Sequence, residues 1–298
     1  MDPGATHGLW ADLYHASLSP TESDFSVLGV PYDGAACARK GAALAPERIR
    51  YWSTHLTPFS EDRTRLGEIR ISDLGDIPIT EQTRDFELVC EKVATLPNLP
   101  IILGGDHSIS IPVFQAQRER YRGHRLGVLW VDAHPDLCDV FTGSKLSHAC
   151  VLRRGLDFGI EPQDVCMVGL RSWEEQEIDL IENSGLNVYT AAMVAERGMR
   201  SVASSVYSKL SRCDAVHISL DIDCLDPAFA PGTGIPDSGG LTSREVITLI
   251  KSMGGLPLVG LDVVEVSPPI DPSEVTVFAA LKIIMEYIAV FAREKQKQ

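Results

Sequence analysis

The chain has 298 residues, of which 44% are hydrophobic and 23% are charged, a composition typical of a globular protein that needs no disulfide scaffold. Its 27 Lys and Arg residues against 41 Asp and Glu residues give a net charge of −14, which argues against a general nucleic-acid binder. A strongly acidic protein instead attracts cations, including metal ions and cationic substrates.

Eight short segments rich in Val, Ile and Leu predict β-strands. They lie at residues 26–30, 68–71, 100–103, 126–131, 165–169, 186–189, 214–220 and 257–266. Longer amphipathic segments predict helices between them, with examples at residues 45–54, 81–96, 109–121, 174–184, 243–253 and 273–293. Most strand segments are continuously apolar, which indicates a sheet that is buried on both faces.

The alternation of strands and helices predicts an α/β fold with a parallel sheet between two layers of helices. No linker, low-complexity segment or repeat interrupts the pattern. We therefore expect one domain over residues 1–298, in which residues 1–23 form a less patterned N-terminal extension. Ligands of such sheets bind beyond the carboxyl ends of the strands, so the residues that follow each strand are the first candidates for a site.

Three predicted strands end in clusters of carboxylates and histidines. The first cluster contains His107 in the sequence GGDHS, the second is DAHPD at residues 132–136, and the third contains Asp221 and Asp223. Side chains at positions i, i+2 and i+4 of a strand end project to the same side. We therefore expect the clusters to converge at one edge of the sheet.

Together these clusters supply four carboxylates and two imidazoles, and they predict a metal site. The six candidate ligands are His107, Asp132, His134, Asp136, Asp221 and Asp223. Clustered carboxylates repel one another in a low-dielectric setting, and divalent cations remove that repulsion. This ligand set suits a pair of Mn²⁺-type ions better than zinc, which prefers tetrahedral nitrogen and sulfur sites. Two such ions can share a water molecule and lower its pKa toward ~7.

Each cluster also has a simpler interpretation when it is taken alone. A single Asp at a strand end is usually a cap or turn residue, and a single His is usually a hydrogen-bonded polar group. Three such clusters at strand ends of one chain are difficult to explain as caps. The combination therefore favours the metal site.

The same segments resemble the arginase/agmatinase (ureohydrolase) family. The resemblance rests on GGDHS at 104–108, DAHPD at 132–136 and SLDIDCLDPAFAPGTGIPDSGGLT at 219–242, and it extends to residues 30–50, 169–172 and 261–271. It implies a three-layer α/β/α fold with a central, mostly parallel eight-stranded sheet, as in arginases and deacetylases. It also implies assembly as a homo-oligomer, either a trimer or a hexamer.

The resemblance further implies two Mn²⁺ ions in each subunit, bridged by Asp132 and Asp221. One ion would be held by the bridging pair together with His107 and Asp136. The other would be held by the bridging pair together with His134 and Asp223. The same ligands would accept Ni²⁺, Co²⁺ or Fe²⁺.

The reaction implied by the resemblance is hydrolysis of a guanidinium group, which releases urea. Asp136 would assist proton transfer, and Glu265 would pair with the guanidinium nitrogens, since a bidentate carboxylate suits a planar cation. His148 would carry a proton to the leaving amine, because a histidine titrates in the required range. The alternatives are a structural ion pair for Glu265 and a surface loop position for His148.

The small guanidino substrate is expected to be cationic. Asp139 and Glu174 would lie near its tail and favour an ammonium over a carboxylate, which indicates agmatine as substrate and putrescine as product. Both acids could equally be solvated surface charges. The related substrates guanidinobutyrate, arginine, guanidine and other guanidino or formimino compounds remain alternatives at this point, as does a catalytically silent metal-binding relative.

Other classes of function fit the sequence less well. The GGDH turn lacks the GxGxxG pattern of a nucleotide-binding loop. We find neither a signal peptide nor a stretch of ~18 uninterrupted apolar residues, so we expect no membrane partner. The seven scattered cysteines contain no CxxC pair and indicate reduced thiols in a cytoplasmic protein.

Overall fold

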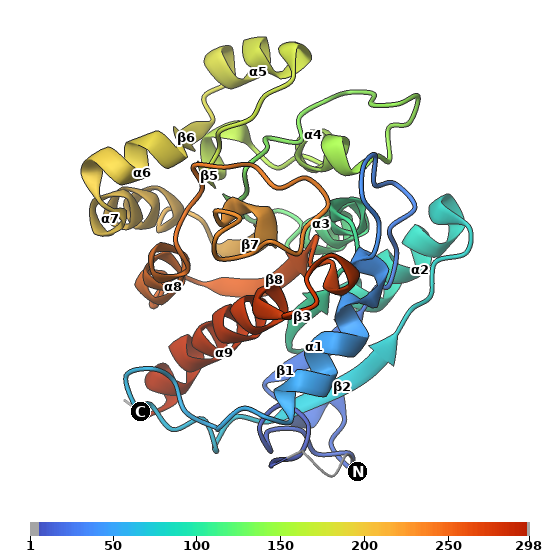
Figure 1. Cartoon of the computed structure of the whole chain (residues 1–298), viewed down its shortest axis with the longest axis vertical. Helices are drawn as coiled ribbons and strands as arrows, with labels where there is room; N and C mark the ends of the chain where they lie inside the picture. Colours follow the sequence, from blue (N-terminus) through green and yellow to red (C-terminus); the bar gives the residue numbers. More distant parts are fainter. Residues whose placement is uncertain (1–5, 297–298) are drawn as a thin grey trace.

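A single eight-stranded sheet forms the centre of the computed structural model, which describes residues 6–296 (Figure 1). The strand order is β2-β1-β3-β8-β7-β4-β5-β6, and every pair of neighbours is parallel. The strands are β1 (Phe25–Gly29), β2 (Ile71–Asp76), β3 (Leu99–Leu103), β4 (Leu126–Val131), β5 (Val165–Val168), β6 (Asn187–Tyr189), β7 (Ala215–Asp221) and β8 (Leu258–Val264). This confirms the predicted α/β class and the eight-stranded sheet.

Helices cover both faces of this sheet and complete the three layers. One face carries α1 (Ala45–Ser53), α6 (Ala191–Arg197), α7 (Met199–Leu210), α8 (Ser243–Ser252) and α9 (Val275–Lys295). The other carries α2 (Gln82–Ala94), α3 (Ser110–Arg120), α4 (Val151–Asp157) and α5 (Ile178–Asn183). Each layer of helices buries its own apolar core against the sheet, so the central strands are covered on both sides.

The register of the four central strands decides where their carboxyl ends lie. Leu103 of β3 pairs with Val263 of β8, which pairs with Leu220 of β7, which pairs with Val131 of β4. These four residues form one level row across the sheet. The polar residues that follow the row therefore emerge at one edge, as the alternation of strands and helices predicted.

Two predicted elements differ from the structure. The strand predicted at residues 68–71 begins at Ile71 and runs to Asp76, because this edge strand is polar and half exposed and lacks a continuous apolar signal. The helix predicted at 174–184 is a 3₁₀ turn, η6 (Glu175–Glu177), followed by the short α5. The predicted examples did not include α4, α6 and α7, of which α7 is rich in serine.

Helix α9 passes a length and composition test for a membrane span, although the sequence predicted no membrane partner. Its most apolar 18-residue window has a mean hydropathy of 2.0, but 72% of that window is buried inside the protein. The helix packs against α1 and α8 over the sheet. Its apolar surface is therefore explained by the core.

Part of the predicted N-terminal extension is built into the fold, while residues 1–5 lie outside the described residues. Trp10 is fully buried, and its Nε1 donates to Oδ2 of Asp73 at 2.8 Å. Its backbone N–H donates to Oγ of Ser53 at 3.0 Å. These contacts fasten the segment to β2 and α1.

Candidate metal centre

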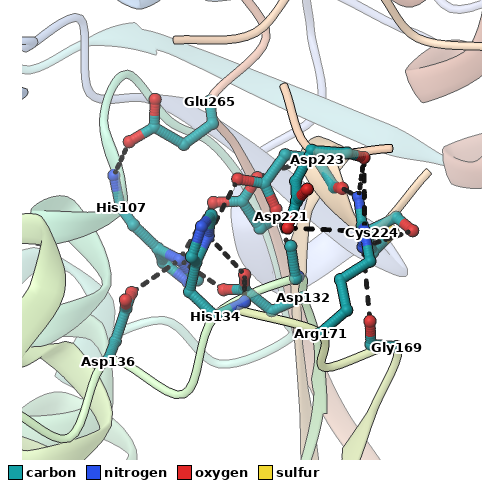
Figure 2. A network of polar contacts seen from close by, with 12 residues as sticks. His107, Asp132, His134, Asp136, Gly169, Arg171, Asp221, Asp223, Cys224 and Glu265 are labelled. Carbon is teal, nitrogen blue, oxygen red and sulfur yellow. Dashed lines mark hydrogen bonds and ion pairs between the residues drawn. The ribbon is translucent and has the colours of Figure 1, made fainter. Parts of the chain in front are cut away.

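The six predicted ligands meet at the carboxyl ends of β3, β4 and β7. Figure 2 shows them pointing toward one another: His107, Asp132, His134, Asp136, Asp221 and Asp223. Nδ1 of His107 lies 3.1 Å from Oδ2 of Asp132, 3.2 Å from Oδ2 of Asp221 and 3.3 Å from Oδ2 of Asp136. One imidazole nitrogen therefore faces three carboxylates.

His134 forms the second half of the cluster. Its Nδ1 lies 3.2 Å from Oδ2 of Asp223 and 3.6 Å from Oδ1 of Asp132. Asp132 thus contacts both histidines, one through each carboxylate oxygen. This placement is the one that a bridging carboxylate requires.

Local backbone contacts hold the carboxylates in place. Oδ1 of Asp132 accepts from the N–H of His134 at 2.6 Å, and Oδ1 of Asp221 accepts from the N–H of Asp223 at 2.8 Å. The N–H of Ala133 donates to Oδ1 of Asp223 at 3.2 Å, which ties the end of β4 to the end of β7. Each of these three carboxylates therefore directs its second oxygen into the cluster.

Asp136 and Glu265 adopt a backbone conformation that is uncommon outside glycine. Their φ angles are 51° and 61°, in the left-handed region. Such residues concentrate at functional sites, where the surrounding structure offsets the strain. The left-handed turn belongs to the loop after β4 for Asp136 and to the end of β8 for Glu265.

The electrostatics of the cluster are unfavourable without a cation. Burial raises the pKa of Asp136 to about 7 and that of Asp221 well above its usual range. Burial also opposes ionisation of Asp132, but the neighbouring imidazoles of His107 and His134 lower the pKa of Asp132 to about 2. For His134, burial disfavours the charged form, yet the carboxylates of Asp223 and Asp132 raise its pKa to about 12. The cluster therefore has to take up protons in place of metal ions.

Two buried polar atoms of the cluster have no hydrogen-bond partner, and coordination to a metal ion would satisfy both. Nδ1 of His107 and Oδ2 of Asp132 are buried and make no hydrogen bond. The ligand atoms of His107, Asp132 and Asp136 lie within 4.8 Å of one another, as do those of Asp132, His134 and Asp223. Carboxylate oxygens and imidazole nitrogens are ligands that divalent first-row metals accept. The residues present therefore fit two divalent ions, with Asp132 common to both groups.

A cavity of about 220 Å³ opens above the cluster. This is below the ~300–1,000 Å³ typical of sites for drug-sized ligands, so it suits a small molecule. Five of the six predicted ligands line this cavity, together with predicted catalytic and substrate-binding residues and further acidic and aromatic residues. The lining includes Cys37, Arg39, His107, His134, Asp136, Phe141, His148, Trp173, Glu174, Glu177, Asp221, Asp223 and Glu265.

His148 is oriented by the segment that follows β1. Its Nδ1 lies 2.7 Å from the carbonyl oxygen of Ala35, so Nδ1 carries the proton and Nε2 is the nitrogen that can exchange one. Burial lowers its pKa below the usual value. The side chain lines the cavity, as a proton carrier must, although its role remains a prediction.

Glu265 is buried on the wall of the cavity. Its Oε1 accepts from the backbone N–H of His107 at 2.9 Å, which fixes the carboxylate beside the cluster (Figure 2). Burial raises its pKa well above the usual range, and the neighbouring Asp106 carboxylate adds to that shift. A cation bound beside Glu265 would favour the ionised form of its carboxylate.

The two predicted tail-binding acids have different positions. Glu174 lines the mouth of the cavity beside Trp173. Asp139 is absent from the residues that line the cavity, and its Oδ1 pairs with Nη2 of Arg154 at 2.6 Å and with Nζ of Lys145 at 3.6 Å. The loop turns this carboxylate toward a helix, which the spacing of the sequence could not reveal.

Glu177 is a lining residue that the sequence analysis missed. It is buried, and its oxygens accept from the N–H groups of Leu137 and Glu174, both at 2.8 Å. These bonds connect the loop after β4 to the loop after β5, which together form part of the rim. The capping box of η6 joins Glu174 to Glu177, and this spacing in the sequence was the available signal.

Comparison with known proteins gives a consistent result. The family model described as the arginase family matches residues 23–289. An agmatinase from Bacillus anthracis is 34% identical over 275 residues, which are 90% of this chain and 91% of that protein. A guanidinobutyrase from Pseudomonas aeruginosa is 31% identical and covers 91% of this chain and 88% of its own length.

The fold is similar to that of solved structures in the same group. The structure of proclavaminate amidinohydrolase from Streptomyces clavuligerus superposes with a TM-score of 0.89 at 32% identity, covering 97% of this chain and 98% of that one. The names of these relatives describe different guanidino substrates. Similarity therefore establishes the group without choosing the substrate.

Proposed function

Because this chain belongs to the arginase family, we propose that it is a binuclear-metal hydrolase that cleaves a small guanidino compound to urea and an amine. Agmatine is the substrate that we favour, with putrescine as the amine product. The observation that carries the proposal is the buried cluster of four carboxylates and two imidazoles beneath a small cavity.

Two Mn²⁺ ions are the metal complement that we favour in each subunit. Oxygen-rich sites suit Mn²⁺, whereas Ni²⁺, Co²⁺ and Fe²⁺ could occupy the same ligands. Bound here, such ions would lower the pKa of a shared water toward ~7 and so supply a hydroxide nucleophile at neutral pH. His107, Asp132, Asp136 and Asp221 would hold one ion, and Asp132, His134, Asp221 and Asp223 would hold the other, consistent with the contacts of Asp132 to both histidines.

The chain's own residues would orient the substrate and move protons. Glu265 would accept hydrogen bonds from the guanidinium nitrogens and hold the planar carbon over the cluster. Asp136 would accept the proton of the attacking oxygen. His148, through Nε2, would deliver a proton to the nitrogen of the leaving amine, so that water and guanidinium become urea and a protonated amine.

Charge on the cavity wall supports a cationic tail. Glu174 lies at the mouth, where its carboxylate can meet an ammonium group. Arg39, which could attract a carboxylate tail, already donates to the carbonyl oxygens of Gly234 and Thr233 at 3.1 and 2.8 Å. An acidic wall raises the local concentration of a cationic substrate.

A panel of guanidines tests the proposal. The metal-free protein is loaded with Mn²⁺, Ni²⁺, Co²⁺ or Fe²⁺, and urea is measured with agmatine, guanidinobutyrate, arginine, guanidine and a formimino compound. We expect agmatine with Mn²⁺ to give the highest kcat/KM. Activity confined to carboxylate-tailed compounds would reject the agmatine assignment, and the absence of urea with every pair would reject the function.

The proposal also includes the oligomeric state of the protein and its location in the cell. By analogy with the family we propose a trimer or hexamer, a cytoplasmic location and a role in supplying putrescine for polyamine synthesis. All seven cysteines lie within the described residues and are free, which supports a reducing compartment. Light scattering after size-exclusion chromatography measures the assembly, and a monomer at micromolar concentration would contradict it.

A further inference from the structure

A chain of buried polar groups runs away from the metal cluster behind His107. Nε2 of His107 lies 3.0 Å from Oγ of Ser219, which donates to Oδ1 of Asp262 at 2.7 Å. Oδ2 of the same carboxylate pairs with Nε2 of His217 at 2.6 Å. We call Ser219, Asp262 and His217 the support chain.

The support chain is sealed from the cavity. Ser219, Asp262 and His217 are each 0% exposed, and none lies on the cavity wall. Ser219 of β7 and Asp262 of β8 pair with each other one residue before the carboxyl-end row of the sheet, and His217 lies two residues earlier on β7. These groups therefore cannot touch a substrate, and any effect on the site passes through His107.

The contacts along the support chain determine which atom donates and which atom accepts in each hydrogen bond. Nε2 of Gln117 lies 3.2 Å from Nδ1 of His217 and 3.2 Å from the carbonyl oxygen of Val259, so its two protons go to these acceptors. His217 then donates from Nε2 to Asp262. Because the hydroxyl of Ser219 also donates to Asp262, its oxygen accepts the Nε2 proton of His107.

This order leaves Nδ1 of His107 as the nitrogen that faces Asp132, Asp136 and Asp221. The imidazole also stacks on Trp130, with ring centroids 4.3 Å apart and planes inclined by 5°. Stacking sets the plane of the ring, and the bond to Ser219 sets its rotation within that plane. Together they present one nitrogen to the metal position.

We propose that Asp262 is a positioning residue that acts through Ser219, orienting His107 so that Nδ1 is held ready to bind metal. The inference rests on the metal site of the proposed function. Buried polar partners of metal-binding histidines commonly fix the tautomer and orientation of the ring, and their loss typically lowers metal affinity about 10–100-fold.

A matched pair of substitutions separates this role from simple support of the core. Oδ1 of Asp262 accepts from two buried hydroxyls, that of Ser219 at 2.7 Å and that of Ser110 at 2.8 Å. Ser219→Ala removes the link to His107, whereas Ser110→Ala removes an equivalent bond to Asp262 and leaves that link in place. The two variants should lose similar thermal stability when they are metal-free.

Metal affinity is the measurement that should distinguish Ser219→Ala from Ser110→Ala. Mn²⁺ binding to each metal-free protein is measured by competition with a fluorescent chelator, and unfolding is followed without metal. We expect Ser219→Ala to bind Mn²⁺ at the His107 site about 10–100-fold less tightly, and Ser110→Ala to stay within about 3-fold of wild type. Asp262→Asn, which keeps the shape of the side chain, should resemble Ser219→Ala.

The outcomes distinguish the two proposals. A wild-type protein that takes up no Mn²⁺ would reject the metal site and the proposed function with it. If wild type binds two Mn²⁺ ions and the two serine variants, Ser219→Ala and Ser110→Ala, bind Mn²⁺ with equal affinity, the proposed role of the support chain is rejected and the metal site is retained. If Asp262→Asn fails to fold, the comparison of the two serine variants still decides the result.

Discussion

The floor and the rim of the cavity are built in different ways. The floor consists of the six clustered side chains, which leave β3, β4 and β7 just after a level row of paired residues. The rim consists of loops, with Trp173 40% exposed and Glu174 also exposed. Sheet register fixes the floor, whereas loop contacts such as those of Glu177 fix the rim. Substitutions at the floor should therefore be far more damaging than substitutions at the rim.

The largest effect is expected at a bridging position of the floor. Asp221→Asn removes a charge that faces His107 and that both ions would share. We expect activity to fall at least about 10³-fold and bound Mn²⁺ to fall below two ions per subunit. Elemental analysis after reconstitution measures the metal, and urea release measures activity.

A control for this variant lies at the opposite end of the same strand. Asp214 precedes β7, and its Oδ2 accepts from the N–H of Arg125 at 2.8 Å on the surface. Asp214→Asn should keep both ions and near-normal activity. Two tightly bound ions in Asp221→Asn would contradict the bridging role.

A smaller loss is expected at His148, which stands between floor and rim. His148→Asn should lower kcat about 10²-fold, the range typical of a general acid, while leaving the metal content intact. Because burial lowers the pKa of His148, its contribution should fade at alkaline pH, where the protonated form is depleted. Normal turnover of the variant across pH 7 to 9.5 would remove His148 from the mechanism.

The pH dependence of metal-induced stabilisation sharpens the description of the floor. Burial raises the pKa of Asp136 to about 7, so the folded metal-free protein holds a proton that the unfolded chain releases above its ordinary pKa near 3.8. Stability from this group is present below pH 3.8 and is lost as pH rises through about 7. Metal binding expels such protons.

We therefore expect the stabilisation by Mn²⁺ to grow from pH 5.5 to 7.5, by up to about 1.4 kcal/mol per pH unit for each proton displaced. Thermal melts with excess Mn²⁺ and with a chelator measure the difference. Asp221→Asn serves as the control and should gain little from Mn²⁺ at either pH. If Mn²⁺ stabilised the wild-type protein equally at both pH values, the metal-free cluster would not hold the protons that we expect.

The smallest effects on activity are expected at the rim, where substitutions of Glu174 and Asp139 should give different results. Glu174→Gln should raise KM for agmatine about 5- to 10-fold with little change in kcat, as expected for lost uniform binding. Asp139→Asn should change KM less than 2-fold, because that carboxylate pairs with Arg154 outside the lining. Equal effects of the two substitutions would contradict this division of the rim.

The same division explains which features could be predicted from the sequence. Asp132 and His134 were predictable neighbours because a strand end projects alternate residues to one side. Asp139 was assigned to the substrate from its place in the chain, yet a loop has no fixed period, and an ion pair with Arg154 decides its direction. The edge strand β2 was misplaced for a related reason, since its polar residues carry no burial pattern.

We expect the floor of the cavity to hold two divalent cations between His107 and His134. Anomalous diffraction from crystals grown with Mn²⁺ tests this expectation most directly. We expect two peaks per subunit, one beside Nδ1 of each histidine, with Asp132 in contact with both. A single peak, or peaks only elsewhere in the protein, would contradict this expectation.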